Sequence, residues 1–193
     1  MQLLSPRLLS AFEFAAVAHH KQYRKNPSHI PYISHPAAVA HILSGCGFSE
    51  DMIIAGLLHD VIEDTEYGAE DIQKLFGGEV LGLVLGVTED KKLPWHERKA
   101  AYNEHLKTAN AAVAALSAAD LLANRGSLLL ALREGKNPWL SFSEKPKEYS
   151  EKIKLIDSQR IAILKVILGE LPLMIELEAA EAETLELTKK ISW

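Results

Sequence analysis

At residues 53–65 the chain reads IIAGLLHDVIEDT, an apolar run that ends in a His-Asp pair and is followed by a Glu-Asp pair. On a helix, with about 100° per residue, His59, Asp60, Glu63 and Asp64 fall within an arc of roughly 140°. The apolar residues occupy the opposite side, and only Gly56 shares the polar side, where it would leave room above the four. The stretch therefore predicts one amphipathic helix, which is capped by Ser49-Glu50-Asp51 and runs to Thr65.

This polar face has two interpretations. The ordinary one is a solvated acidic face. However, one imidazole and three carboxylates would lie within two turns, where like charges repel each other. A bound cation would remove that repulsion, so the remaining sequence is searched for further ligands.

Composition indicates an ordinary globular protein of 193 residues, with 48% hydrophobic and 24% charged residues. We find no uncharged apolar run near the ~18 residues that span a bilayer and no signal-peptide pattern. The single cysteine, Cys46, excludes an intramolecular disulfide framework. A net charge of −5 argues against a nucleic-acid-binding surface. We expect a cytoplasmic protein with neither nucleic-acid nor membrane partners.

Helical spacing of apolar residues recurs along the chain, and no stretch is a strong strand candidate. The sequence predicts an all-α fold, a single-domain helical bundle over residues 1–193. Its motif-bearing part covers about residues 8–135, and its C-terminal helices about 147–189. Predicted helices lie at about 5–21, 36–45, 50–65, 69–76, 80–87, 94–105, 109–135, 147–169 and 172–189.

His35 precedes Pro36, and proline suits the first position of a helix because its missing N–H would be unpaired there. The residue before a proline favours an extended backbone. We therefore expect His35 just outside a helix that begins at Pro36, where its side chain can point inward.

Asp120 lies in an alanine-rich segment, residues 111–123, with few charged neighbours. Aspartate is rarely buried without a partner. That partner could be a ligand, a backbone group or Arg125. Asn124 and Ser127 can share the face of Asp120.

Arg24 and Lys25 are adjacent cations in a loop, residues 23–34, that lacks a helical period. Such cations usually face solvent. They are equally suited to hold phosphate if the loop borders a pocket.

Two imidazoles and two carboxylates, from His35, His59, Asp60 and Asp120, make a mixed set of nitrogen and oxygen ligands for one divalent ion. A site of this kind that stays partly open can bind water and a phosphate oxygen together. Glu63 and Asp64 would lie beside it.

In this order and spacing, the residues resemble the HD superfamily of metal-dependent phosphohydrolases, and within it the small alarmone hydrolases. The resemblance covers roughly residues 8–135, and the Glu-Asp pair after His59-Asp60 is specific to the alarmone-hydrolysing branch. The matching stretches are YRK at 23–25, PYISHP at 31–36, LLHDVIEDT at 57–65, VTEDK at 87–91, LPW at 93–95 and SAAD at 117–120, with Asn124.

The resemblance implies an HD-type bundle that hydrolyses the 3′-diphosphate of guanosine 3′,5′-bis(diphosphate) (ppGpp) or its pentaphosphate relative. The products would be GDP or GTP and pyrophosphate, and the usual metal would be Mn²⁺. By position, the metal ligands would be His35, His59, Asp60 and Asp120; Glu63 and Asp64 would orient and deprotonate water; Arg24, Lys25 and Asn124 would bind the guanine nucleotide.

One segment departs from the family pattern. Family members commonly carry a basic residue, Leu, His and Asn after the last ligand, where this chain has Leu121-Leu122-Ala123-Asn124. Lost basic groups could change the contacts around the pocket. Two alternatives therefore remain: a phosphohydrolase for another nucleotide, such as a mononucleotide or NADPH, and a non-catalytic nucleotide-sensing module.

Overall fold

The computed structural model describes residues 5–25, 29–142 and 145–193, and most of them lie in helices. The helices are α1 (Pro6–Ala18), α2 (Ser34–Gly45), α3 (Glu50–Leu58), α4 (Val61–Asp64), α5 (Ala69–Phe76), α6 (Gly78–Val87), α7 (Trp95–Leu106), α8 (Ala111–Arg133), α9 (Pro146–Leu168) and α10 (Pro172–Thr188), with a 3₁₀ turn, η1 (Pro138–Ser141). The only β pairing among the described residues is an isolated bridge between Tyr23 and Pro31. The all-α prediction is confirmed.

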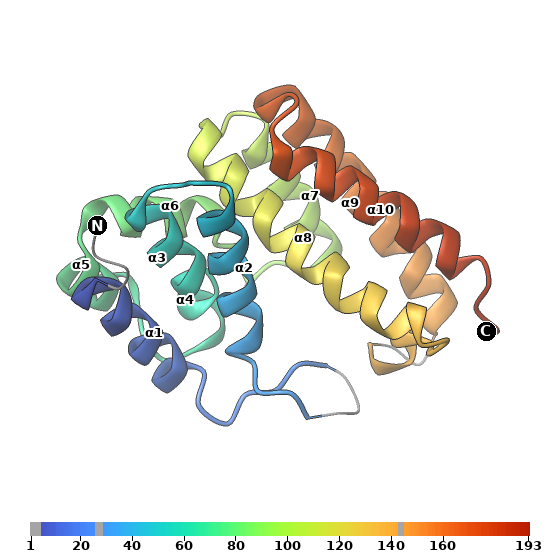
Figure 1. Cartoon of the computed structure of the whole chain (residues 1–193), viewed down its shortest axis with the longest axis horizontal. Helices are drawn as coiled ribbons and strands as arrows, with labels where there is room; N and C mark the ends of the chain where they lie inside the picture. The colour runs from blue at the N-terminus through green and yellow to red at the C-terminus, as the bar shows by residue number, and fades with distance from the viewer. Residues whose placement is uncertain (1–4, 26–28, 143–144) are drawn as a thin grey trace.

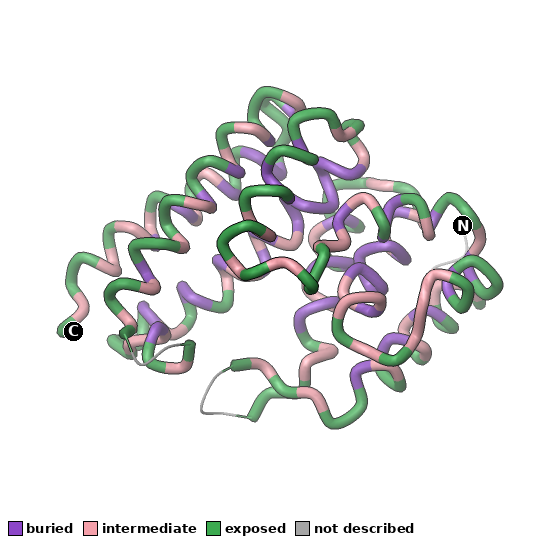
Figure 2. The backbone as a smooth tube through the Cα atoms, turned by 180° about the vertical axis from the view of Figure 1, so that it is seen from behind, coloured by how far each residue is buried: buried purple, intermediate pink, exposed green. Residues whose placement is uncertain are grey.

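The long helix α8 runs through the middle of the bundle (Figure 1) and packs against α2 and α6 as well as α9 and α10. The helices α1 and α3–α6 gather towards one end of the molecule, and α9 and α10 lie alongside α8 at the other. Buried residues lie within both groups and along α8 (Figure 2), and most of them form one apolar core. Helix α8 thus joins the two groups.

Polar side chains fix where several helices begin. Ser5 accepts a hydrogen bond from the backbone of α1, Ser49 from α3 and Asn110 from α8. Each of these caps satisfies a backbone N–H that has no partner within its helix.

Helix α2 begins two residues earlier than predicted. Both His35 and Pro36 lie in its first turn, because the helix starts at Ser34. All of the first four N–H groups of a helix lack a partner inside it, so proline is tolerated at the third position too. The prediction that His35 lies outside the helix was wrong.

The predicted single helix over residues 50–65 is interrupted at the ligands. Helix α3 ends at Leu58, and α4 begins at Val61 after a turn at His59 and Asp60. The prediction of a continuous helix was wrong at this point, although the Asp64 N–H still donates to the Asp60 carbonyl at 2.9 Å.

The helical projection suggested open space beside Gly56, but the structure shows none. Gly56 is buried, and a Cβ added there would lie 2.8 Å from Leu43 Cδ1 and 3.3 Å from the Ala40 backbone nitrogen. The glycine therefore permits α2 and α3 to approach closely. His35 lies on one of these helices and His59 ends the other, so this contact helps to set their spacing.

One helix in the described part of the chain, α8, is long and apolar enough to cross a membrane by length and composition alone. However, 67% of its most apolar window is buried inside the bundle, as in the core helix of a soluble protein.

Candidate active site

A cleft of about 1230 Å³ opens beside α8 and is lined by residues from both helix groups. Every site residue predicted from the sequence contributes to its wall. These residues are Arg24, Lys25, His35, His59, Asp60, Glu63, Asp64, Asp120 and Asn124.

The four predicted ligands, which we call the His/Asp cluster (His35, His59, Asp60 and Asp120), converge in this cleft. One potential ligand atom from each of His35, His59 and Asp120 lies within 4.8 Å of the other two. The Nε2 atom of His35 is 3.0 Å from Asp120 Oδ1. Asp60 Oδ2 lies 3.1 Å from His59 Nε2 and 3.7 Å from His35 Nε2. Two helices, α2 and α8, and the turn between α3 and α4 thus bring together residues that are up to 85 positions apart.

The tautomer of His59 suits a metal ligand. Its Nδ1 lies 2.8 Å from the Gly56 carbonyl, which can only accept, so Nδ1 carries the proton and Nε2 keeps a lone pair. That Nε2 is buried without a hydrogen-bond partner, although the Asp60 carboxylate lies close to it. Two acceptor atoms this close repel each other unless a proton or a cation lies between them. The donor set therefore fits a divalent ion.

The negative charges of Asp60 and Asp120 favour a proton or a cation bound within the cluster. Burial disfavours a charged His59, but Asp60 and Asp120 outweigh it and raise the pKa of the imidazole well above its usual value. Burial likewise opposes ionisation of Asp60, yet the neighbouring imidazoles hold the pKa of its carboxyl below its usual range. Metal ions and protons would thus compete for the same atoms.

Tyr32 supports the cluster from outside. Its hydroxyl donates to Asp60 Oδ2 at 2.6 Å. Burial and the charge of Asp60 raise the pKa of the phenol, so the hydroxyl keeps its proton and remains a donor. Contacts of this type orient metal ligands.

Glu63 and Asp64 lie beside the cluster in different surroundings. The Glu89 N–H donates to Glu63 Oε1 at 2.6 Å. Burial, helped by the charges of Asp60 and Glu89, raises the pKa of Glu63 to about 7. Asp64 instead pairs with Lys91. A carboxyl group with a pKa near neutrality is suited to accept a proton in catalysis.

The predicted substrate contacts are connected to the cluster. Asn124 Nδ2 donates to Asp120 Oδ1 at 2.8 Å, and Arg24 Nη2 donates to Asn124 Oδ1 at 2.8 Å. The Arg24 guanidinium also lies 5.6 Å from the centre of the Tyr32 ring. Lys25 is exposed at the cleft. The loop that carries the two cations therefore borders the pocket.

The pair of Asp120 with Arg125, which the sequence left open, does not form. Arg125 instead pairs with Asp157 at 2.6 Å and with Glu181. Ser127 lines the cleft, but its hydroxyl donates to the Ala123 carbonyl of its own helix.

Leu121 and Ala123, which stand where the family commonly has basic and imidazole side chains, are 3% and 8% exposed and belong to the main apolar core. Apolar packing therefore replaces the polar groups at these two positions.

Several residues at the site escaped the sequence analysis. No role was assigned to Tyr32 or Lys91, although both lie in the matching stretches, and Gln22, whose Nε2 donates to the Asp64 carbonyl at 2.6 Å, was not considered. Loop residues lack a periodic pattern. Only their place in the matching stretches, for Tyr32 and Lys91, or near Arg24 in the sequence, for Gln22, could have identified them.

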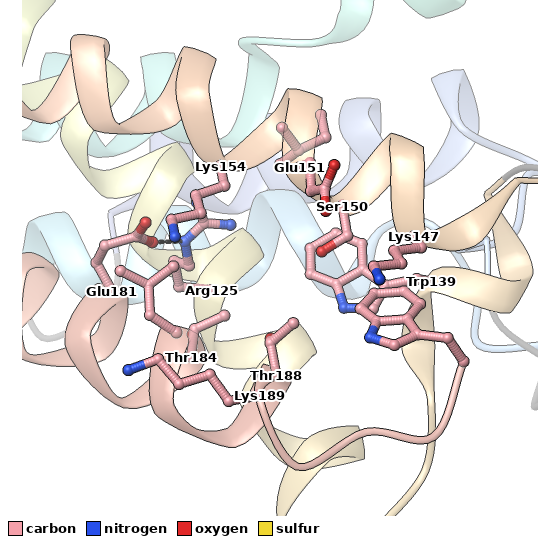
Figure 3. A pocket seen from close by; sticks show the side chains of 13 residues that line it. Arg125, Trp139, Lys147, Ser150, Glu151, Lys154, Glu181, Thr184, Thr188 and Lys189 are labelled. Carbon is pink, nitrogen blue, oxygen red and sulfur yellow. Dashed lines mark hydrogen bonds and ion pairs between the residues drawn. The ribbon is translucent and has the colours of Figure 1, made fainter.

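A second, smaller hollow of about 170 Å³ lies among η1, α9 and α10 (Figure 3). None of the predicted site residues lines it. Its wall consists of Arg125, Trp139, Lys147, Ser150, Glu151, Ile153, Lys154, Glu181, Thr184, Leu185, Thr188, Lys189 and Trp193. The larger cleft is therefore the candidate active site.

Comparison with known proteins shows which family and which structures the chain resembles. The family model described as "HD domain" matches residues 11–124, more than half of the chain. Guanosine-3′,5′-bis(diphosphate) 3′-pyrophosphohydrolase MESH1 from Drosophila melanogaster is 40% identical over 122 residues, which are 62% of this chain and 68% of that protein. The Homo sapiens protein of the same name is 39% identical over 131 residues, 67% of this chain and 73% of that protein.

A solved structure extends the similarity over nearly the whole chain. It is described as "A metazoan ortholog of SpoT hydrolyzes ppGpp and plays a role in starvation responses" and has a TM-score of 0.82 at 29% sequence identity. The alignment covers 95% of this chain and 98% of that one, so the C-terminal helices are included in the shared fold.

Proposed function

We propose that this chain, which belongs to the HD domain family, hydrolyses the 3′-diphosphate of ppGpp and of its pentaphosphate relative, releasing GDP or GTP and pyrophosphate. The carrying observation is the convergence of the His/Asp cluster beside Glu63 in one cleft. Relatives about 40% identical to the chain are named as hydrolases of this nucleotide, which supports the choice of substrate.

The His/Asp cluster would hold one divalent ion, for which we propose Mn²⁺. When bound, such an ion polarises a phosphoryl oxygen and lowers the pKa of a water molecule from about 15.7 towards ~7. The fixed tautomer of His59 and the Tyr32–Asp60 hydrogen bond keep ligand atoms directed at this position.

Glu63 would accept the proton of the attacking water, because its raised pKa balances proton affinity against ionisation near neutral pH. Asp64 would help to orient that water, with Lys91 holding its carboxylate. Lys91 Nζ also lies 4.0 Å from Glu63 Oε2, so the two carboxylates share this cation, and the pKa of Glu63 is raised towards neutrality.

Arg24, Lys25 and Asn124 would bind the nucleotide. Two cations at the mouth of the cleft can neutralise phosphate charge that builds up in the transition state, which is the main protein contribution to phosphoryl transfer. Hydrogen bonds connect Arg24 to Asn124 and Asn124 to Asp120. A substrate phosphate that displaced Arg24 from Asn124 would therefore also affect the hydrogen bond on the proposed ligand Asp120.

A second candidate substrate is another phosphorylated nucleotide, such as a mononucleotide or NADPH. Leu121 and Ala123 favour it, because apolar packing stands where basic groups are common in the family. A non-catalytic sensing module is disfavoured, because the predicted catalytic carboxylates and ligands all line one cleft.

The deciding experiment measures pyrophosphate release from ppGpp with and without Mn²⁺, for the wild type, Asp60→Ala and Glu183→Gln. Glu183 pairs with Arg133 on the exposed surface and serves as a control carboxylate. We expect release that requires both Mn²⁺ and Asp60 and that Glu183→Gln leaves unchanged. If the wild type binds Mn²⁺ but does not release pyrophosphate, the substrate assignment is wrong, and NADPH and mononucleotides should be assayed next.

A cytoplasmic location, action as one domain over residues 1–193, and the lack of nucleic-acid and membrane partners stay predictions of the sequence.

A further inference from the structure

Glu89 is a buried carboxylate beside the proposed proton acceptor, and it lines the same cleft. Its side chain is 8% exposed, in the loop that follows α6. Lys99 Nζ donates to its Oε1 at 2.7 Å, Arg98 Nε lies 3.0 Å from Oε2, and Arg160 Nη2 lies 3.8 Å from Oε1. Three cations from α7 and α9 therefore compensate one carboxylate, more than its burial alone requires.

The backbone of the same residue makes the contact with the site. The Glu89 N–H is the donor to Glu63 Oε1 at 2.6 Å. Two residues later, Lys91 pairs with Asp64. One short loop thus contacts both carboxylates of the proposed catalytic pair, and the ion pairs of the Glu89 side chain fix that loop to α7 and α9.

Arg160 is the contribution of α9, which lies outside residues 11–124 that the family model matches. It is 5% exposed, and its guanidinium lies 4.6 Å from the centre of the Tyr102 ring. The Tyr102 hydroxyl donates to Ser117 Oγ at 2.9 Å, in the turn of α8 that precedes Asp120. Arg160 is therefore held in place by α7 and, through Tyr102, by the helix that carries a ligand.

We propose that Glu89 is a positioning residue for the reaction, locked by Lys99, Arg98 and Arg160 so that its backbone N–H orients Glu63. This inference rests on the proposed function, in which Glu63 accepts the proton. The Glu63 carboxylate accepts a hydrogen bond from the Glu89 N–H. If the loop moves and this bond breaks, the carboxylate can rotate away from the water, and the reaction slows because catalysis depends on near-attack geometry. Through Arg160, which also lines the cleft, the C-terminal helix α9 thus contributes to catalysis by positioning Glu63.

The test compares the full-length wild type with Arg160→Met, Arg160→Lys and Glu89→Gln, in two measurements. The first is hydrogen exchange of the Glu89 amide in the metal-free protein, relative to the Leu116 amide in the core of α8. The second is the kcat and KM of pyrophosphate release. Leu164→Ala is the matched control, because Leu164 is fully buried one turn further along α9 and its truncation costs about 2–5 kcal/mol of stability.

We expect Arg160→Met and Glu89→Gln to speed the relative exchange of the Glu89 amide and to lower kcat about tenfold, with little change in KM. Arg160→Lys should recover part of both effects, since it restores a cation. Leu164→Ala should lower stability and leave kcat and the relative exchange unchanged.

The inference is overturned if Arg160→Met and Glu89→Gln keep wild-type kcat, or if kcat falls while the Glu89 amide stays as protected as in the wild type. A wild type without pyrophosphate release contradicts the proposed function instead. The exchange measurement needs neither substrate nor metal, so it still decides whether these cations fix the Glu89 amide.

Discussion

Two buried polar clusters lie on the same helix, five residues apart on α8. The His/Asp cluster includes Asp120, and the second, which we call the Arg125 cluster (Arg125, Asp157 and Glu181), joins α8 to α9 and α10. From the sequence, Arg125 was only one possible partner of Asp120. The internal chemistry of the two clusters separates them.

In the Arg125 cluster, donors meet acceptors. The guanidinium donates to Asp157 and to Glu181, so its charge is compensated within the protein. In the His/Asp cluster, acceptors meet acceptors, since the lone pair of His59 Nε2 faces carboxylate oxygens. The first arrangement already has a cationic donor between its two carboxylates, although Glu181 Oε1 lacks a hydrogen-bond partner, whereas the second requires a cation or protons. Acceptor atoms that face each other without a cationic donor between them therefore distinguish the candidate functional site from the Arg125 cluster.

The largest expected effect is the loss of pyrophosphate release, and Mn²⁺ binding then distinguishes the proposed metal ligands from the proposed proton acceptor. Asp60→Ala should abolish both Mn²⁺ binding and pyrophosphate release, because it removes a ligand charge. Glu63→Ala should abolish release but keep Mn²⁺ binding, because Glu63 lies beside the ligands. Calorimetric titration with Mn²⁺ on both folded variants checks this. Equal Mn²⁺ affinity in the two variants would remove the distinction between the roles.

Arg125→Met should lower the stability of the protein and leave Mn²⁺ binding intact. It leaves two carboxylates buried without a cation, which typically costs about 3–5 kcal/mol of unfolding free energy. Urea denaturation of the metal-free protein measures the loss, and titration below the unfolding transition should show one Mn²⁺ bound per folded chain. Neutralising both acids as well, with Asp157→Asn and Glu181→Gln, should recover part of the stability. A loss below about 1 kcal/mol would mean that the cluster is solvated.

Glu63→Gln should stabilise the metal-free protein at alkaline pH. The folded-state pKa of Glu63, about 7, exceeds the ordinary value of 4.5, so the folded state binds the proton more tightly than the unfolded state. The stability from this group is present below about pH 4.5 and is lost as the pH rises through about 7. At about pH 8 the variant should exceed the wild type by roughly 2–3 kcal/mol, and the difference should shrink towards pH 5.

Urea midpoints at the two pH values measure this difference. A pH-independent difference would show that burial does not raise the pKa of Glu63, and its role as proton acceptor would lose support.

The smallest expected effect concerns Tyr32. Tyr32→Phe removes the hydrogen bond to Asp60 and keeps the ring beneath Arg24. Loss of such a supporting contact typically weakens metal affinity about tenfold or more. Mn²⁺ titration measures it, and an unchanged affinity would show that Asp60 is oriented by the turn at residues 59–60 alone.

The helices were largely predictable from the sequence because apolar spacing and capping residues are local. Ser5, Ser49 and Asn110 act as caps, and eight of the nine predicted helices match observed ones to within about three residues at their ends. The candidate ligands were predictable for a different reason: only a few residue types bind metals, and their order matches the family pattern.

Contacts between distant residues could not be predicted in this way. Nothing in the local sequence indicates that Arg125 pairs with Asp157 rather than with Asp120, or that Arg160 reaches Glu89. The turn at His59 and Asp60 also falls within a strong helical pattern, and tertiary contacts override such patterns at a ligand site.

The contact at Gly56 has a consequence for metal binding. A hydrogen atom at this position lets α2 and α3 lie in van der Waals contact, and the imidazole rings of His35 and His59 are held with their centres 5.2 Å apart. The spacing of the two imidazoles therefore depends on how closely the two helix backbones approach. Gly56 thus acts on the cluster in two ways, through this close approach and through the carbonyl that fixes the tautomer of His59, so a larger residue at position 56 should weaken binding of a divalent ion there.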